Sequence, residues 1–467
     1  MAKHISSDSF FEKIGISVIA QAISLIISFI LNLIVPKFIS EYSYSCWQTY
    51  LLYIGYVGLL HFGLLDGILL RYSQYDYDKL DKSILRSQYQ LLVVLNVVFA
   101  IVFLIISFFL KSSFESAIMI LIGIGIITKN GFYYTLYIFQ MTNRIKGYAV
   151  LSIMQRIAYG GISVILILFK IDNFVWFCIA DLIGDSIGIF FGIVSSRDLY
   201  LGKISDTKKV IKDFKMNISA GIKLMIANWS ATMIVGFAKT IIQYKWGVFV
   251  FGKISFSFSL TNLFLSFIAA SAIVLFPSLK RMEPDCLPVL YARIRNMLTP
   301  SLIIIMSLYF PVCGILNRWL PNYAESLSYL GLLLPMIIFS AKTTLLTDNY
   351  LKAYRKENDL LYINLGSIVF AFTGFLFFSF VFDSIDGMIL WVVASIALRF
   401  IVSEHRVGKI IEKFYPKENL LDMIWAFLFV ICARNLSLIY GFILYSMSLF
   451  FYVPVANLLT KKHSIAH

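Results

Sequence analysis

The sequence predicts an all-α polytopic membrane protein with about fourteen transmembrane helices. Three observations lead to this fold class: the composition, the length of the apolar runs and the alternation of basic loops. Of 467 residues, 59% are hydrophobic and 14% are charged, and mean hydropathy is +0.82. Soluble domains are nearer half apolar and a quarter charged, so this chain needs a solvent other than water.

The apolar residues are collected in long runs. A run of about 20 residues is long enough to cross a bilayer as a helix. The first run lacks a small-residue cleavage site and is too long for a signal peptide, so it is expected to remain as the first span. We expect spans near 14–36, 47–70, 88–110, 116–140, 147–169, 173–195, 218–243, 254–277, 298–317, 327–350, 360–381, 385–404, 420–440 and 441–459.

The loops between these spans alternate in charge. Alternate loops, together with both ends of the chain, hold 27 Lys and Arg residues, and the remaining loops hold five. Because basic loops stay on the cytoplasmic side, the bias predicts that both termini are cytoplasmic. This bias also accounts for the net charge of +14, so the charge does not indicate a nucleic-acid partner.

Loop lengths suggest how the chain is divided. We expect a six-helix bundle over residues 1–195, a basic cytoplasmic linker over 196–217, a second six-helix bundle over 218–404, and an added helix hairpin and tail over 405–467. No loop is long enough for a soluble domain. Two halves with an even number of spans are expected to be parallel repeats, with a substrate site between them near the midplane.

Four basic residues lie well inside predicted spans. Lys129 and Arg156 are central, and Lys239 and Lys342 lie about two turns from an end. A central charge costs at least about 2.5–3.5 kcal/mol and should face a partner or water. Polar residues share their helix faces: Tyr133 with Lys129; Ser152, Tyr159 and Ser163 with Arg156; Asn228 and Thr232 with Lys239. Such stripes predict an aqueous cleft, or, alternatively, hydrogen bonds between helices.

Two acids, Asp181 and Asp185, lie one turn apart in the sixth span. They could form a proton or sodium site, or they could be counter-ions for Lys129 and Arg156. We favour counter-ions, which would leave Lys239 and Lys342 as unpaired cations of the second half. The sequence contains no phosphate loop, zinc motif or nucleophilic triad, so we expect no enzyme activity, no catalytic or metal-binding residues and no cofactor.

Two segments resemble a known family. Residues Phe62–Tyr75 read F-G-L-L-D-G-I-L-L-R-Y-S-Q-Y, and Val274–Met282 read V-L-F-P-S-L-K-R-M. Both resemble segments of bacterial O-antigen and capsule repeat-unit flippases, which form the polysaccharide transporter family of the MOP superfamily. The resemblance implies two six-helix bundles in a V, as in multidrug and toxin extrusion transporters, plus a C-terminal helix pair.

The resemblance also implies a substrate and partners. The substrate is an oligosaccharide on undecaprenyl pyrophosphate, which crosses from the cytoplasmic to the outer leaflet. The partners are membrane lipids, a polysaccharide polymerase and a chain-length regulator. Cations and aromatic rings suit an anionic sugar head group. We therefore expect contacts from Arg156, Lys239, Lys342, Lys129, Tyr159 and Asn228.

Other functions remain open at this point. A drug-cation antiporter of the same superfamily would favour unpaired acids in its cavity, and this chain has more bases than acids there. A peptidoglycan-precursor flippase shares the fold. A repeat-unit polymerase usually has a large outer loop, which this chain lacks, and a non-transporting scaffold would not need buried charged stripes.

Overall fold

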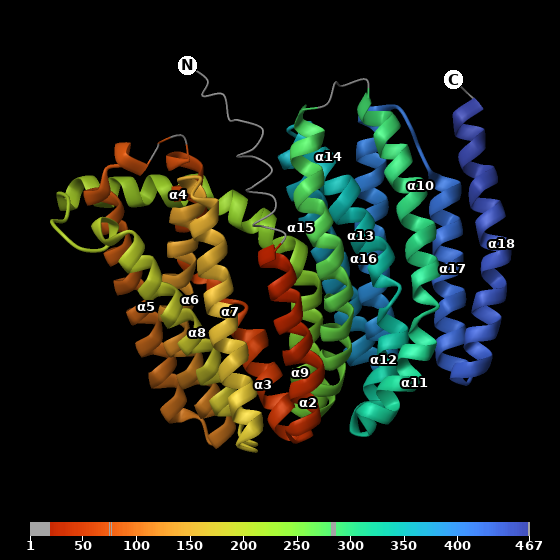
Figure 1. The fold of residues 1–467 in the computed structure, drawn as a ribbon, viewed down its shortest axis with the longest axis horizontal. Helices are drawn as coiled ribbons and strands as arrows, with labels where there is room; N and C mark the ends of the chain where they lie inside the picture. The colour runs from red at the N-terminus through yellow and green to blue at the C-terminus, as the bar shows by residue number, and fades with distance from the viewer. Residues whose placement is uncertain (1–18, 74, 76, 282–285, 466–467) are drawn as a thin grey trace. The chain divides into compact units, whose positions relative to one another are not determined.

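The computed structural model describes residues 19–73, 75, 77–281 and 286–465, and those residues form helices and loops without a strand. The chain divides into two compact units, Met1–Trp229 and Ser230–His467. The boundary falls inside one long helix, α9, and not in the basic linker over residues 196–217. Figure 1 shows the order of the helices along the chain.

The helices of the first unit follow one another through short turns. They are η1 (Ile30–Ile34), α2 (Val35–Phe38), α3 (Glu41–Ile54), η2 (Val57–His61), α4 (Leu64–Tyr72), η3 (Tyr77–Lys79), α5 (Lys82–Phe109), α6 (Ser113–Met141), α7 (Ile145–Leu168), α8 (Phe174–Ser195), η4 (Arg197–Leu199) and the start of α9 (Thr207–Arg281).

The second unit contains the rest of α9 and the helices after it. These are α10 (Leu287–Met306), α11 (Tyr309–Trp319), η6 (Pro321–Tyr323), α12 (Ala324–Leu333), α13 (Met336–Lys342), η7 (Thr343–Thr347), α14 (Asp348–Ala353), α15 (Glu357–Leu376), η8 (Phe377–Val381), α16 (Ile385–Ile411), α17 (Pro416–Asn435) and α18 (Leu438–Ile465).

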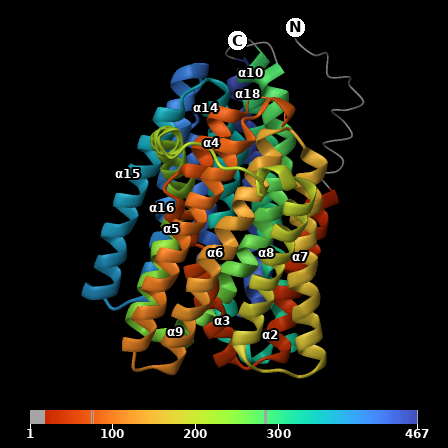
Figure 2. The same cartoon turned by 90° about the vertical axis from the view of Figure 1, so that its left-hand side faces the viewer.

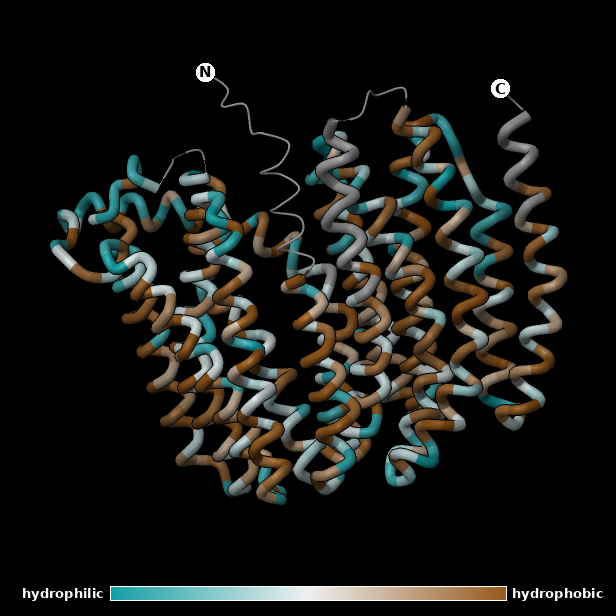
Figure 3. Tube along the Cα trace, viewed as in Figure 1, coloured by the Kyte–Doolittle hydropathy of each residue, from teal (hydrophilic) through white to brown (hydrophobic). Residues whose placement is uncertain are grey.

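Many of these helices are long and apolar enough to span a bilayer, which confirms that the chain is an all-α polytopic membrane protein. Ten helices in the described part of the chain meet this test, and twelve spans result if two bent helix pairs each count as one. Apolar residues predominate along the helices, and polar residues gather toward their ends (Figure 3). On α5, Val94, Ile101 and Phe108 are exposed, as expected of side chains that face lipid.

Polar caps fix where several helices begin. The Asp81 carboxylate accepts a hydrogen bond from the backbone N–H of Ile84 at the start of α5, 3.2 Å away. The Ser384 hydroxyl accepts from the N–H of Gly387 at the start of α16, 3.0 Å away. Each cap satisfies one backbone donor that the helix leaves without a partner, so the membrane helices begin at defined residues.

The helix α9 contains one break, at Gly247, where φ is 82° and ψ is 176°. The ammonium of Lys239 lies 5.1 Å from the ring centroid of Phe258. In a straight helix these two residues would be about 28 Å apart along the axis. The chain therefore turns back at the break, and the two arms correspond to the seventh and eighth predicted spans.

The second span is bent at Gly63. Its halves, Glu41–His61 and Leu64–Tyr72, meet at 54°. Gly63 has φ of 80°, a left-handed conformation that glycine adopts without strain. The Nδ1 atom of the buried His61 accepts a hydrogen bond from the Gly63 N–H at 3.1 Å, which holds the bend.

The last two helices, α17 and α18, pack within the second unit. Tyr445 on α18 donates a hydrogen bond to the carbonyl oxygen of Ile303 on α10, 3.0 Å away. Tyr452 donates to the carboxylate of Asp422 on α17, 3.1 Å away. In this structure the C-terminal hairpin is thus part of the core of the second unit.

Candidate functional site

A buried charge cluster lies in the first unit, between α6 and α8. The ammonium of Lys129 is 2.7 Å from a carboxylate oxygen of Asp185 and 3.2 Å from one of Asp181. The exposed fractions are 9% for Lys129, 4% for Asp181 and 0% for Asp185. The predicted pairing of these acids with Lys129 is therefore confirmed, and we call the three residues the acid–lysine cluster.

Neighbouring helices supply further hydrogen bonds to the acid–lysine cluster. Tyr50 on α3 donates to Asp181 at 3.1 Å, and Gln155 on α7 donates to Asp185 at 3.1 Å. The backbone of Gly184 packs so closely on α7 that an added Cβ would lie 2.8 Å from the carbonyl oxygen of Gln155. With every group ionised, two carboxylates face one ammonium, so the cluster has one excess negative charge.

Arg156 lies apart from the acid–lysine cluster. Its side chain is exposed, and no carboxylate in the described part of the chain is within ion-pair distance. The expectation that Arg156 is a second counter-ion partner of the acids is therefore not met. This guanidinium is available to a ligand, whereas the ammonium of Lys129 is already neutralised.

The position of Arg156 on α7 shows that it does not belong to the lipid-facing side. Gly160 and Ser163, which lie one and two turns further along the same face, are both buried. The exposed apolar residues of α7, such as Val150, Ile157 and Ile165, point to a different side of the helix. Arg156 therefore shares the side of α7 that is turned toward protein and is nevertheless accessible.

Tyr159 and Asn228 have different surroundings. Tyr159 is buried, and its ring lies edge-on to that of Trp47 with centroids 6.5 Å apart. Its ring belongs to the packed part of the first unit, although the sequence groups it with Arg156. Asn228 on α9 is exposed and lies in the first unit.

Lys239 lies in the second unit on the first arm of the α9 hairpin. Its side chain is partly exposed, and its ammonium lies over the ring of Phe258. Within the described residues, no carboxylate lies within ion-pair distance of this ammonium. Lys239 therefore keeps the unpaired positive charge that the sequence predicts for it, partly offset by a cation–π contact.

The expectation that Lys342 is an unpaired cation is wrong. Lys342 is fully buried in the second unit, 2.7 Å from the carboxylate of Asp422 on α17. Its ammonium also donates to Asn419 at 3.3 Å and lies 4.2 Å from the Phe400 ring. The sequence does not reveal Asp422 as the partner, because Asp422 comes 80 residues after Lys342 and the spacing of charges within one helix does not show which helix packs beside it.

Arg295 extends this buried network. The sequence places Arg295 in a cytoplasmic loop, but α10 begins at Leu287 and carries its side chain into the core, 3% exposed. Its guanidinium is 2.8 Å from Glu404 on α16 and donates to Asn419 at 2.8 Å. Two cations and two carboxylates thus balance within the second unit. The arrangement suits a structural core, because each charge has an opposite partner.

The F-G-L-L-D-G segment, which includes the start of α4, packs against α9. An added Cβ on Gly67 would overlap the backbone oxygen of Asn217, and one on Gly221 would overlap that of Gly63. The backbones of the two helices therefore touch. Asp66, within the same segment, accepts a hydrogen bond from Tyr137 at 3.3 Å. The sequence resemblance singles out this segment, but it does not show that its glycines form a contact between α4 and α9.

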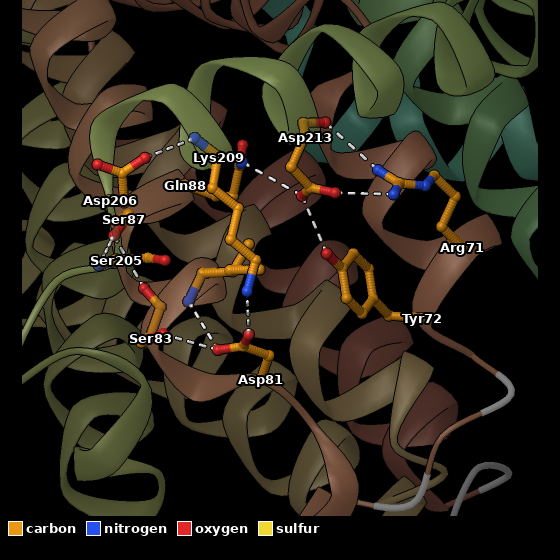
Figure 4. Close-up of polar contacts among 11 residues, drawn as sticks. Arg71, Tyr72, Asp81, Ser83, Ser87, Gln88, Ser205, Asp206, Lys209 and Asp213 are labelled. Carbon is orange, nitrogen blue, oxygen red and sulfur yellow. Dashed lines mark hydrogen bonds and ion pairs between the residues drawn. The ribbon is translucent and has the colours of Figure 1, made fainter.

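Within the first unit, Asp213 makes a second set of contacts between the start of α9 and the helices α4 and α5 (Figure 4). Its carboxylate is 2.7 Å from Arg71 on α4 and accepts hydrogen bonds from Tyr72 at 2.9 Å and Gln88 at 3.3 Å. Asn217 also donates to it, at 3.1 Å. The linker that the sequence predicts over residues 196–217 is thus bound to α4 and α5.

Some predictions lie outside the part of the chain that the structure describes in full. The side chains of the second motif, residues 274–282, are among them. So are Lys3, Lys13, Lys461 and Lys462, which contribute to the predicted cytoplasmic charge of the two termini. Within the described residues, no group of three His, Cys, Asp or Glu side chains is placed to hold a metal ion.

Comparisons with known proteins show which solved structures share this fold. No family model matches the chain, and no curated protein matches it. An inward-facing multidrug-resistance transporter of the MATE family, in the MOP superfamily, shares 14% identity, covering 85% of this chain and 100% of that one, with a TM-score of 0.61. A lipid II flippase, MurJ, in an inward closed conformation, shares 12% identity over 96% of this chain and 99% of its own, with a TM-score of 0.67.

A third similar structure is a MOP superfamily transporter from Pyrococcus furiosus, whose description reports a binding pocket of reverse polarity. It shares 12% identity over 86% of this chain and 96% of that one, with a TM-score of 0.56. At these identities the similarity shows the fold. The protein is a multi-pass membrane protein with the fold of MOP superfamily transporters.

Proposed function

We propose that this protein is a flippase that carries an undecaprenyl-pyrophosphate-linked oligosaccharide repeat unit from the cytoplasmic to the outer leaflet of a bacterial inner membrane. Both termini would be cytoplasmic, and the product would pass to a polysaccharide polymerase and a chain-length regulator. The fold shared with a lipid II flippase over 96% of the chain supports a lipid-linked substrate. Arg156 carries the proposal.

Arg156 suits an anionic head group for two reasons. It is an exposed cation on the side of α7 that faces protein. A guanidinium can form two parallel hydrogen bonds to a phosphate, which a lysine cannot reproduce. Lys239, partly exposed and without an acidic partner in the described part of the chain, is the candidate for a second anion contact. Asn228 is exposed and would supply neutral hydrogen bonds to sugar hydroxyls.

The same charges disfavour a drug-cation antiporter. Such a transporter would need accessible acids, but Asp181 and Asp185 are buried and bound to Lys129. Lys129 and Tyr159 are buried, and we assign them to supporting the site in this conformation. The excess carboxylate of the acid–lysine cluster could bind a proton or a small cation, so ion coupling through these acids remains part of the proposal.

A peptidoglycan-precursor flippase is the second candidate, and the TM-score of 0.67 to the lipid II flippase favours it. The experiment that separates the two is deletion of the gene in its host. The proposal predicts loss of the surface polysaccharide, accumulation of lipid-linked repeat units and normal peptidoglycan synthesis. Accumulation of lipid II with cell lysis would instead identify the peptidoglycan precursor as the substrate. Unchanged surface glycan would reject the proposal.

A further inference from the structure

The first turns of α9 lie across the end of the first bundle. Figures 1 and 2 show this segment running crosswise to α5 and α6, and Figure 2 views it along its axis. Because α5 and α6 span the bilayer, a helix that crosses their ends runs along the membrane surface. This segment is therefore at the level of the lipid head groups.

One side of this helix is bound to the bundle. Val210, Asp213 and Asn217 are buried, and their spacing puts them on one face. The contacts of Asp213 with Arg71, Tyr72 and Gln88 fix that face against α4 and α5 (Figure 4). Such an anchor leaves the helix no freedom to rotate about its axis, so the opposite face has a defined direction.

The opposite face consists of lysines. Lys208, Lys212 and Lys215 follow one another at helical spacing and are all exposed. We call these three residues the lysine row. No carboxylate in the described part of the chain lies within ion-pair distance of the lysine row. The two acids nearest in sequence have other contacts, since Asp206 accepts from the backbone of Lys209 and Asp213 binds Arg71.

Apolar side chains accompany the lysine row. On the helix, the exposed fractions are 45% for Ile211 and 47% for Met216, and in the segment just before it they are 54% for Leu201 and 60% for Ile204. Like charges at this spacing repel one another weakly, so anions from outside the chain would stabilise a row of three. Exposed apolar residues next to lysines on a surface helix are typical of segments that bind the boundary between head groups and acyl chains.

We propose that the lysine row and its neighbouring apolar residues form a binding surface for the phosphate head groups of anionic bilayer lipids. Charge complementarity identifies the partner, because phosphatidylglycerol-type lipids carry a negative charge at the level where this helix lies. Each lysine is expected to contribute about fivefold in affinity, so removal of all three should weaken the binding about a hundredfold. The surface does not depend on the identity of the transported substrate.

The test compares two triple variants of the full chain in detergent. The first replaces the lysine row (K208Q, K212Q, K215Q). The control replaces three exposed lysines elsewhere in predicted cytoplasmic segments (K356Q, K409Q, K417Q), with the same loss of charge. Native mass spectrometry counts bound phosphatidylglycerol against phosphatidylcholine, and gel filtration checks that each variant is folded.

The proposal predicts that wild type and the control retain phosphatidylglycerol preferentially and that the row variant loses this preference. Equal retention by both variants, or equal loss by both, would overturn it. A competition arm adds inorganic pyrophosphate at increasing concentration. Displacement of phosphatidylglycerol by micromolar pyrophosphate would also overturn the proposal, since it would identify the surface as a site for the substrate's head group. Displacement only at ionic strengths that screen charge in general supports lipid binding.

Discussion

The acid–lysine cluster allows a prediction in which charge counting decides the order of stability. Lys129 neutralises one of two carboxylates, and all three groups are nearly or completely buried. Lys129→Met would leave two buried carboxylates without a cation. Breaking a buried ion pair by removing one partner costs about 3–5 kcal/mol, because the other charge stays buried and unpaired. We expect a loss of at least this size.

Asp185→Asn should behave differently. It leaves Lys129 and Asp181 as a balanced pair, 3.2 Å apart, and it retains an oxygen that can accept the hydrogen bond from Gln155. The cost should then be close to that of one altered hydrogen bond, about 0.5–1.5 kcal/mol. The triple variant K129M, D181N, D185N removes every charge and should also be more stable than K129M alone.

The assay heats the purified protein in detergent and measures, at each temperature, the fraction that remains monodisperse. Lys111→Met, which removes an exposed lysine, is the matched control and should resemble wild type. The predicted order of midpoint temperature is wild type, then D185N and the triple variant, with K129M lowest. Equal losses for K129M and D185N, or a triple variant no better than K129M, would refute the charge-balance argument.

Three further predictions concern the contacts of α9, the topology and the response to acid. Gly67→Ala should destabilise the protein by about 1–3 kcal/mol, because the added Cβ overlaps the backbone of Asn217. The control Gly161→Ala, whose Cβ meets nothing within 4 Å, should be neutral or stabilising. Equal thermal midpoints for the two variants would contradict the α4–α9 contact. Cysteines placed at Lys208 and Lys253 should be labelled from opposite sides of the membrane; labelling from one side would break the span count. Burial raises the pKa of Asp198, but hydrogen bonds from Lys82 and Tyr77 and the positive charge of Lys82 outweigh burial and hold the pKa below its usual value. The resulting contribution to stability is present above about pH 4 and is lost as pH falls through the lowered pKa. Asp198→Asn should therefore reduce acid sensitivity below pH 4 and cost less than about 1 kcal/mol at pH 7, since the Lys82–Asp198 pair is partly exposed to solvent.

The sequence was sufficient to predict the helices and one buried charge pairing. Apolar runs of membrane length predict spans without any knowledge of packing. Lys129, Asp181 and Asp185 could be grouped because they were mid-depth charges of opposite sign within one half of the chain. Neutralisation of charges in a low-dielectric bundle is a strong constraint, so the pairing followed from depth and sign.

The network of the second unit could not be predicted in the same way. Arg295 pairs with Glu404, 109 residues later, and helical periodicity shows only which residues share a face of one helix. Glu404 and Asp422 lie near the ends of their predicted spans, where charges are common, so depth did not distinguish them. The close contact of Gly67 with Asn217 likewise depends on which helices are neighbours.

The most direct test of the proposed function is flipping of an undecaprenyl-pyrophosphate-linked oligosaccharide in proteoliposomes, with Arg156 varied. Wild type should move the substrate between leaflets, and Arg156→Gln should abolish this movement while remaining folded. Arg156→Lys should restore it only in part, because it keeps the charge but loses the paired hydrogen bonds. Flipping at the wild-type rate by Arg156→Gln, or the absence of flipping by the folded wild-type protein, would contradict the account.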